Sequence, residues 1–224
     1  MCQYLFENFT QRDDFHQVVL VGILITLDKT KKDPTKTNLM YLCIFMLLSI
    51  SGSRELAMTL NQQFTLKVRF SDMPVFEKGV CTYADLIFVS IYKLIHSGPR
   101  LLRPIYKSIV AIVANIAPYT KSLAREACDG LIYLVQVCTK AEFLSEREDN
   151  AKTATALFEC LNYLIAYHDE TQQHLQIQLM KNQNLFDSLE SPEFENSFKQ
   201  FSKQADKNEE SAESQLLKKM AKDS

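Results

Sequence analysis

The side chains of this 224-residue chain that come closest to a metal-binding group are His168, Asp169, Glu170 and His174. Imidazole nitrogens and carboxylate oxygens are zinc ligands, and a helical zinc site places two histidines four residues apart with a glutamate after the first. The four residues do not match that spacing, and they lie where one expected helix ends and the next begins. An ordinary solvated turn is therefore the favoured interpretation, and we predict no metal ligand in the chain.

Cysteines are a second source of chemistry to consider. The six are Cys2, Cys43, Cys81, Cys128, Cys138 and Cys160, and no two form a Cys-x-x-Cys pair. A nucleophilic cysteine requires a histidine partner in space and a lowered pKa, neither of which can be read from this sequence. Cys160 follows Glu159 inside an apolar-periodic segment, where a packing residue is the favoured interpretation. Scattered cysteines of this kind are typical of a reducing compartment.

The five glycines are too far apart to form a Gly-x-Gly-x-x-Gly motif or a P-loop, so phosphate-binding loops of those kinds are excluded. We therefore predict no catalytic and no cofactor-binding residue, and a protein that is not an enzyme. One alternative stays open, a hydrolase or transferase whose site carries no recognised motif. Such an enzyme would gather several ionisable side chains with perturbed pKa values in a concave pocket.

Hydrophobic residues make up 46% and charged residues 23% of the chain, and the net charge is −2. This composition predicts a substantial core and gives no electrostatic field that would attract nucleic acid. The N-terminal sequence MCQYLFENFT lacks the pattern of a signal peptide, and Cys2 occupies the position of the glycine that myristoylation requires. The most apolar runs, 18–27 and 39–50, are shorter than the roughly 18 to 20 residues that cross a bilayer. We therefore predict a cytoplasmic protein that does not bind nucleic acid.

A lysine-rich loop separates those two apolar runs, with Lys29, Lys31, Lys32 and Lys36. Such a loop can contact anionic lipid, which would give peripheral membrane contact. Four lysines in a loop more often serve only to solvate it, and that is the favoured interpretation.

Prolines and apolar periodicity divide the chain into expected helices. Proline is tolerated best between helices or in a first turn, and the prolines at such places are Pro34, Pro74, Pro99, Pro104 and Pro118. The periodicity predicts helices over about 14–27, 38–50, 51–60, 82–95, 105–117, 121–139, 150–167 and 171–181. Thr37 or Asn38 is the expected N-cap of the second helix.

The faces of three of these helices are informative. The helix over 82–95 is amphipathic, and we expect Asp85, Lys93 and His96 to point away from its apolar side. The helix over 105–117 is apolar on nearly every side, which predicts a central position. The helix over 121–139 has one apolar stripe, formed by Leu123, Ala127, Leu131, Leu134 and Cys138.

Helices of about 13 to 19 residues with short connections predict an all-α fold of layered antiparallel helices, similar to an armadillo or HEAT segment. Because no sequence motif repeats, a compact irregular bundle stays open as the alternative. Phe64, Leu66, Val68 and Phe70 alternate with polar residues, so one extended segment is expected near 64–70. An extended stretch folded over the helices is favoured there over a strand that pairs with a partner.

The composition changes near residue 190. Residues 191–224 mix Lys, Glu, Ser and Gln with few large apolar residues, which is typical of a solvated tail. We expect a helical domain over 1–190, which can be a segment of a longer helical array, and a mobile charged tail over 191–224.

One long stretch resembles a known family. It contains NLMYLCIFMLLSISGSRELAMTLNQQFTLKV, then SDMPVFEKGVCTYADLIFVSIYKLIHSG, then LLRPIYKSIVAIVANIAPYTKSL. The most specific signatures are the apolar run that ends in Ser-Gly-Ser-Arg, Met-Pro-Val-Phe followed by Ala-Asp-Leu, and Asn-Ile-Ala-Pro-Tyr followed by Lys-Ser-Leu. Their order and spacing resemble the high-temperature-induced dauer-formation protein family, from about residue 15 to 189 and most strongly over 39–123.

The resemblance implies a cytosolic peripheral membrane protein of the Golgi, distantly related to dymeclin, that acts in secretory cargo sorting and vesicle formation without known enzymatic activity. The expected function is therefore a non-enzymatic helical scaffold that binds protein partners of the trafficking machinery. Members of this family are several times longer, often begin with Met-Gly and carry a further C-terminal region. A structural fragment of a longer trafficking protein is accordingly an alternative. Neither the partner-binding residues nor the oligomeric state follows from the sequence.

Overall fold

A computed structural model describes residues 15–64, 70, 81–97, 102–147, 149–168 and 171–202, and these ranges form an all-α fold, as the periodicity predicts. The longer helices are α2 (Phe15–Thr30), α3 (Thr37–Ser51), α5 (Tyr83–Ser97), α7 (Tyr106–Ile116), α8 (Arg125–Cys138) and α10 (Asn150–His168). The shorter helices are α4 (Arg54–Thr59), α9 (Ala141–Glu146), α11 (Gln173–Lys181) and α12 (Gln183–Leu189). Single 3-10 turns lie at Pro34–Lys36, Arg103–Ile105 and Ala117–Tyr119.

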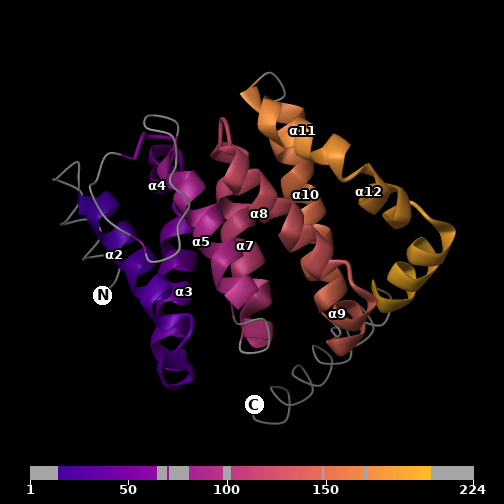
Figure 1. Cartoon of the computed structure of the whole chain (residues 1–224), viewed down its shortest axis with the longest axis horizontal. Helices are drawn as coiled ribbons and strands as arrows, with labels where there is room; N and C mark the ends of the chain where they lie inside the picture. Colours follow the sequence, from indigo (N-terminus) through magenta and orange to yellow (C-terminus); the bar gives the residue numbers. More distant parts are fainter. Residues whose placement is uncertain are drawn as a thin grey trace, which may run out of the picture.

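The helices are arranged in two layers that run across the molecule (Figure 1). In one layer α2 packs on α5, α5 on α8 and α8 on α11, and in the other α3 packs on α7 and α7 on α10. Contacts of α2 with α3, of α5 with α7 and of α8 with α10 join the layers. The described part of the chain is therefore a row of stacked helix pairs, which confirms the layered arrangement expected from helix lengths and loop lengths.

The core follows α5 and α7. Ile109, Ile112 and Val113 of α7 are fully buried, so the predicted central position of this helix is confirmed. The apolar stripe from Leu123 to Cys138 is also buried along its whole length. Helix α5 packs on α2, α7 and α8 and is buried on more sides than its amphipathic pattern indicates. Aliphatic side chains thus fill the space between the layers.

The start of α3 differs from the prediction. Neither Thr37 nor Asn38 caps the helix, because Pro34 begins a 3-10 turn that leads directly into it. Asp33 is the N-cap residue of this turn, and its carboxylate accepts a hydrogen bond from the Thr35 amide at 3.0 Å. The Thr37 hydroxyl instead donates to the Pro34 carbonyl at 2.7 Å.

Helix α8 begins four residues later than expected, because side chains from distant parts of the sequence hold the preceding segment in an extended connection. Asn61 donates to the Tyr119 carbonyl at 2.6 Å and accepts from the Lys121 amide at 2.9 Å. Gln172, which is 1% exposed, accepts from the Leu123 amide at 3.1 Å. Such hydrogen bonds satisfy buried backbone groups that no helix satisfies here.

Asp85 binds the last residue of this extended connection before α8. We expected its side chain to point away from the core, and this expectation was wrong. Its side chain is buried, and one carboxylate oxygen accepts from the amide of Thr82 at 2.8 Å and from its hydroxyl at 2.9 Å. The Thr82 hydroxyl accepts in return from the Asp85 amide at 3.2 Å, which completes a capping box for α5. The other oxygen accepts from the amide of Ala124, the N-cap residue of α8, at 2.7 Å. Burial raises the pKa of this carboxyl in spite of its hydrogen bonds.

Gly130 allows α5 and α8 to pack closely. A Cβ atom at this position would lie 2.8 Å from the Cβ atom of Tyr92 and 3.6 Å from the Phe88 carbonyl oxygen. The first distance is shorter than carbon atoms tolerate, so a larger residue would force the two helices apart. Gly22 on α2 differs, because no atom lies within 4 Å of the corresponding Cβ position.

Two predicted segments are only partly described. Residues 192–202 of the expected tail are helical, and the rings of Phe194 and Phe198 stack with their centroids 5.7 Å apart while packing against the core. Residues 203–224 lie outside the described ranges, so the mobile charged tail stays a prediction. Of the expected extended segment, Phe64 is described and its amide donates to the Cys81 carbonyl at 2.8 Å, whereas residues 65–69 lie outside the described ranges.

Substitution of the two helical glycines should have opposite effects on stability. Gly130→Ala is expected to lower the free energy of unfolding by about 0.5 to 2 kcal/mol, because the clash with Tyr92 outweighs the gain in helix propensity. Gly22→Ala is expected to raise it by about 0.5 to 1 kcal/mol, because the new methyl group meets open space. Urea denaturation followed by circular dichroism measures both, and a stabilising Gly130→Ala would contradict the close packing of α5 on α8.

Removal of the Asp85 carboxylate should destabilise the fold. Asp85→Ala is expected to lower the free energy of unfolding by about 2 to 4 kcal/mol, because it removes a cap and leaves the Thr82 and Ala124 amides without an acceptor. Asp187→Ala, at an exposed position of α12, is the matched control and should change it by less than about 0.5 kcal/mol. Equal effects of the two substitutions in urea denaturation would argue against the role of Asp85.

Candidate interaction surface

Helix α3 is apolar on both of its sides and contains no charged residue. The side facing α2 and α7 is buried, with Ile44 and Leu47 almost fully enclosed. The opposite side also carries large apolar residues, and their exposed fractions are 41% for Leu39, 55% for Leu42, 51% for Phe45 and 41% for Met46. We call these four residues the outer face of α3. A helix that is apolar all round is normally buried all round, so this half-exposed helix is unusual.

Helix α3, which carries this face, lies with α2 at one end of the row of helix pairs (Figure 1). The α2–α3 pair packs through α2 on α5 and through α3 on α7. On its other side α2 exposes 55% of Val18, and Gly22 is also exposed. Arrays of stacked helices usually end in a pair with a polar outer face, which keeps them soluble. The end formed by α2 and α3 has the chemistry of an interface instead.

No partner-binding residue was predicted from the sequence, so this face was missed. The signal was present in the run from Leu39 to Ile50, which is apolar at positions that face both sides of a helix. Such a pattern indicates burial on two sides, but it does not show which neighbour covers each side.

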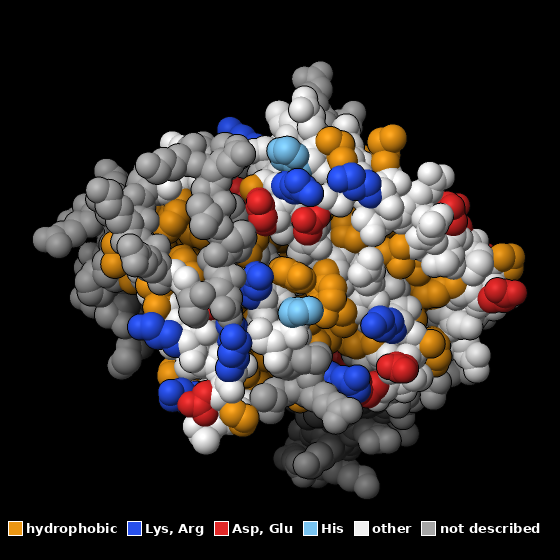
Figure 2. Space-filling view, viewed as in Figure 1, with side chains coloured by type: hydrophobic (Ala, Val, Ile, Leu, Met, Phe, Trp, Pro, Cys, Tyr) orange, Lys and Arg blue, Asp and Glu red, His pale blue; other side chains and the backbone are white. Residues whose placement is uncertain are grey.

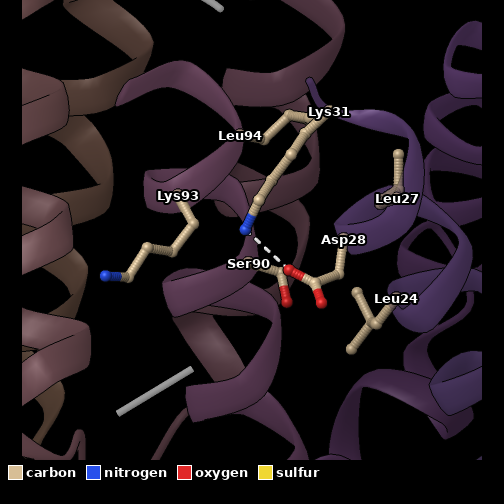
Figure 3. A pocket seen from close by; sticks show the side chains of 7 residues that line it. All are labelled: Leu24, Leu27, Asp28, Lys31, Ser90, Lys93 and Leu94. Atoms are coloured by element: carbon tan, nitrogen blue, oxygen red, sulfur yellow. Dashed lines mark hydrogen bonds and ion pairs between the residues drawn. The ribbon is translucent and has the colours of Figure 1, made fainter. Parts of the chain in front are cut away.

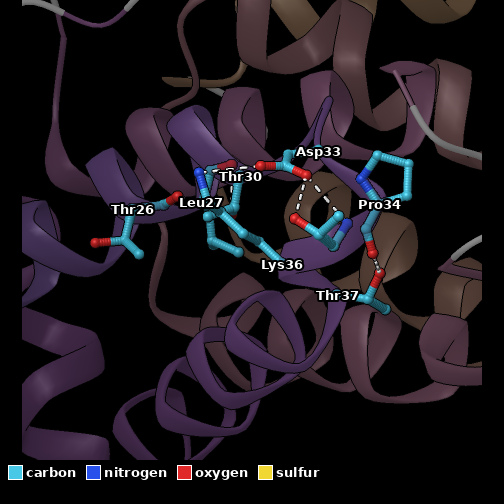
Figure 4. A network of polar contacts seen from close by, with 8 residues as sticks. Thr26, Leu27, Thr30, Asp33, Pro34, Lys36 and Thr37 are labelled. Carbon is cyan, nitrogen blue, oxygen red and sulfur yellow. Dashed lines mark hydrogen bonds and ion pairs between the residues drawn. The ribbon is translucent and has the colours of Figure 1, made fainter.

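The turn between α2 and α3 is rigidly hydrogen bonded (Figure 4). The Thr30 hydroxyl donates to the Thr26 carbonyl at 2.8 Å, and the Asp33 amide donates to the Thr30 carbonyl at 2.9 Å. The hydrogen bond from the Thr35 hydroxyl, followed by that from Lys36, lowers the pKa of Asp33 to about 2. The turn thereby fixes the position of α3 next to α2.

Lys31 and Lys36 of this turn are paired with carboxylates, and Lys29 and Lys32 are exposed. The Lys36 ammonium lies 3.0 Å from the Asp33 carboxylate. Lys31, which we expected to be solvated, is 5% exposed and lies 2.6 Å from the Asp28 carboxylate. Pairing weakens the attraction of Lys31 and Lys36 to an anionic surface, and lipid contact through this loop stays a proposal.

Charged side chains of both signs are interspersed over the face of the molecule that Figure 2 shows. No extended area of one sign is visible on that face, which agrees with the net charge of −2. Within the described ranges, no helix combines the length and the hydropathy that a membrane span needs.

A small hollow lies between α2 and α5 (Figure 3). Its lining includes the Asp28–Lys31 ion pair and Ser90, whose hydroxyl has no hydrogen-bond partner although it is buried. The empty volume is about 250 Å³, part of it open to solvent. A second hollow next to Tyr83 has about 270 Å³. Both are smaller than the roughly 300 to 1,000 Å³ of sites for small molecules.

The described cysteines are all buried and reduced. Burial raises the pKa of Cys81, Cys128, Cys138 and Cys160 to about 12, and it also raises that of Cys43. Cys160 is 1% exposed, and its thiol donates to the Ala156 carbonyl at 2.9 Å. Burial thus keeps these thiols protonated, and a protonated thiol is a poor nucleophile.

The four residues that came closest to a metal-binding group are not brought together by any described contact. His174 is exposed on α11, and Asp169 and Glu170 lie outside the described ranges. Among the residues that are described, no group of three His, Cys, Asp or Glu side chains could hold a metal ion.

The fold and this surface define the class of protein: an all-α protein of stacked helix pairs, whose terminal pair includes a helix with an uncharged, exposed apolar face. The family model of the high-temperature-induced dauer-formation protein matches residues 2–224. The chain belongs to this family.

Relatives in animals and in an amoeba match the same proportion of the chain. Protein HID1 of Homo sapiens and that of Mus musculus are each 31% identical over 171 residues, which cover 76% of this chain and 21% of the relative. Protein HID1 of Dictyostelium discoideum is 27% identical over 170 residues, which cover 76% of this chain and 18% of the relative. The chain thus spans about a fifth of the length of these relatives. No solved structure matches it.

The exposure of the outer face can be tested by stability. Leu42→Glu is expected to change the free energy of unfolding by less than about 0.5 kcal/mol, because the new carboxylate stays in water. Leu47→Ala, on the buried side of the same helix, should lower it by about 2 to 5 kcal/mol. Urea denaturation at low protein concentration compares the two, and a large loss for Leu42→Glu would mean that the chain itself covers this face.

Proposed function

We propose that this chain is a non-enzymatic helical scaffold of Golgi-linked secretory trafficking, which takes part in cargo sorting and vesicle formation by binding protein partners. The family to which the chain belongs supports the trafficking role, through the Golgi function that the sequence resemblance implies. The observation that carries the binding role is the uncharged, half-exposed outer face of α3. Exposed apolar patches of this kind mark interaction sites more often than chance.

The alternative of an unrecognised hydrolase or transferase has less support. An active site needs ionisable groups with perturbed pKa values in a hollow that can hold a substrate. In the described part of the chain, the buried Asp85 caps helices and the thiols pack in the core. The hollow next to Ser90 and the hollow next to Tyr83 are both small for a substrate site.

A second candidate role is structural, as one segment of a longer trafficking protein. The same outer face favours this role, because a further helix pair stacked on α2 and α3 would cover it. The match to the human relative covers 21% of that relative's length, which agrees with a role as one segment of a longer protein.

The trafficking role is tested by the location of the tagged chain in its own cells. The chain is expected to concentrate at a Golgi marker, with or without residues 191–224, and to label trafficking proteins in a proximity assay. Joint Leu42→Glu and Phe45→Glu substitution should abolish the labelling of partners, because carboxylates replace the apolar contacts. Met180→Glu changes an apolar residue that is 76% exposed on α11 and is the matched control. A uniformly cytosolic signal for the unsubstituted chain would contradict the Golgi role.

A further inference from the structure

We propose that the outer face of α3 packs on the same face of a second copy of this chain across a two-fold axis. The inference rests on the proposed function only in using this face as a binding surface, and it does not depend on a role at the Golgi.

The spacing of the outer face suits a helix-to-helix contact. Leu39, Leu42 and Met46 follow one another at intervals of three and four residues, which is the spacing of the seam between two packed helices. Phe45 lies beside this seam, and Leu42 and Phe45 are near the middle of α3. In a two-fold contact both copies present the same patch, so α3 meets its mate antiparallel with these central residues next to the axis. The contact repeats the type of packing that α3 already makes with α7.

The absence of charge on α3 favours its own copy as the occupant. Two identical surfaces that carry charge repel each other unless the charges alternate, whereas the 15 residues of α3 contain no charged side chain. A partner that binds through charged groups would find no complement on this face. Helices that lie in a membrane surface carry lysine or arginine on their polar side. The other side of α3 is instead apolar and buried against α2 and α7, so a lipid surface fits less well.

The area of the face predicts the strength of the contact. Four large side chains that are each about half exposed leave on the order of 350 Å² of apolar surface per copy, or about 700 Å² for the pair. Stable dimers bury about 1,200 to 2,000 Å² in total, and smaller interfaces are weak or transient. The dimer should therefore form at high concentration of the chain and dissociate at low concentration.

Analytical ultracentrifugation of the purified whole chain tests the inference, at concentrations from about 1 to 200 µM, where weak interfaces associate. The average mass is expected to rise from the 25.8 kDa of one chain toward twice this value. Leu42→Glu and Phe45→Glu should each keep the chain monomeric throughout, because the substituted carboxylates would meet at the two-fold axis. Met180→Glu, at an exposed apolar position of α11, should associate like the unsubstituted chain.

A chain that stays monomeric over the whole range would overturn the inference. Association that persists in both α3 variants, or that Met180→Glu abolishes, would also overturn it, because another face would then be responsible. If a glutamate variant loses helicity, the serine variant at the same position, Leu42→Ser or Phe45→Ser, is used instead. Each serine variant is expected to raise the dissociation constant of the dimer at least about tenfold. If the unsubstituted chain associates but does not concentrate at the Golgi, the trafficking role alone is contradicted. If it concentrates at the Golgi but stays monomeric, self-association alone is contradicted.

Discussion

The buried carboxylate of Asp85 connects α5 and α8, the two helices at the middle of one layer. One of its oxygens caps the start of α5, and the other holds the amide of Ala124 at the start of α8. The position of each helix along the other is thereby fixed at the ends, and Gly130 allows their bodies to approach. Because α2 packs on α5 and α11 packs on α8, a shift between these two helices would propagate through the whole layer.

Helix faces could be read from the sequence because burial follows the apolar period. The stripe from Leu123 to Cys138 and the central position of α7 were predicted from this period alone. The role of Asp85 was missed, since a carboxylate in an amphipathic helix normally faces water. A Thr-x-x-Asp sequence before an apolar run is a capping signal, so the bond to Thr82 could have been found. The bond to Ala124 spans 39 residues of sequence, and only the fold shows it.

The exposure of the outer face of α3 could not be predicted from the sequence. The run from Leu39 to Ile50 correctly indicates an apolar helix, but periodicity gives no direction when both sides of a helix are apolar. Burial against α2 and α7 accounts for one side. The free-energy cost of leaving the other side in water is of the order of 25 cal/mol for each Å², so the face gains from any contact that covers it. The chain therefore carries a driving force for association that does not depend on which partner is present.

Polar groups and apolar surface have separate tasks in this protein. The buried Asp85 and Gln172 satisfy backbone amides, and Asp28 lies in a buried ion pair with Lys31. A group committed to such bonds is not available for proton transfer or metal binding, because releasing it would leave a buried partner unsatisfied. Binding in the described part of the chain must then come from side chains that the architecture does not use. Leu42 and Phe45 meet that condition, since they are half exposed on a helix whose other side already holds it in place. Rigid placement of an exposed apolar face reduces the entropy lost on binding, which suits the binding role that we propose for this face.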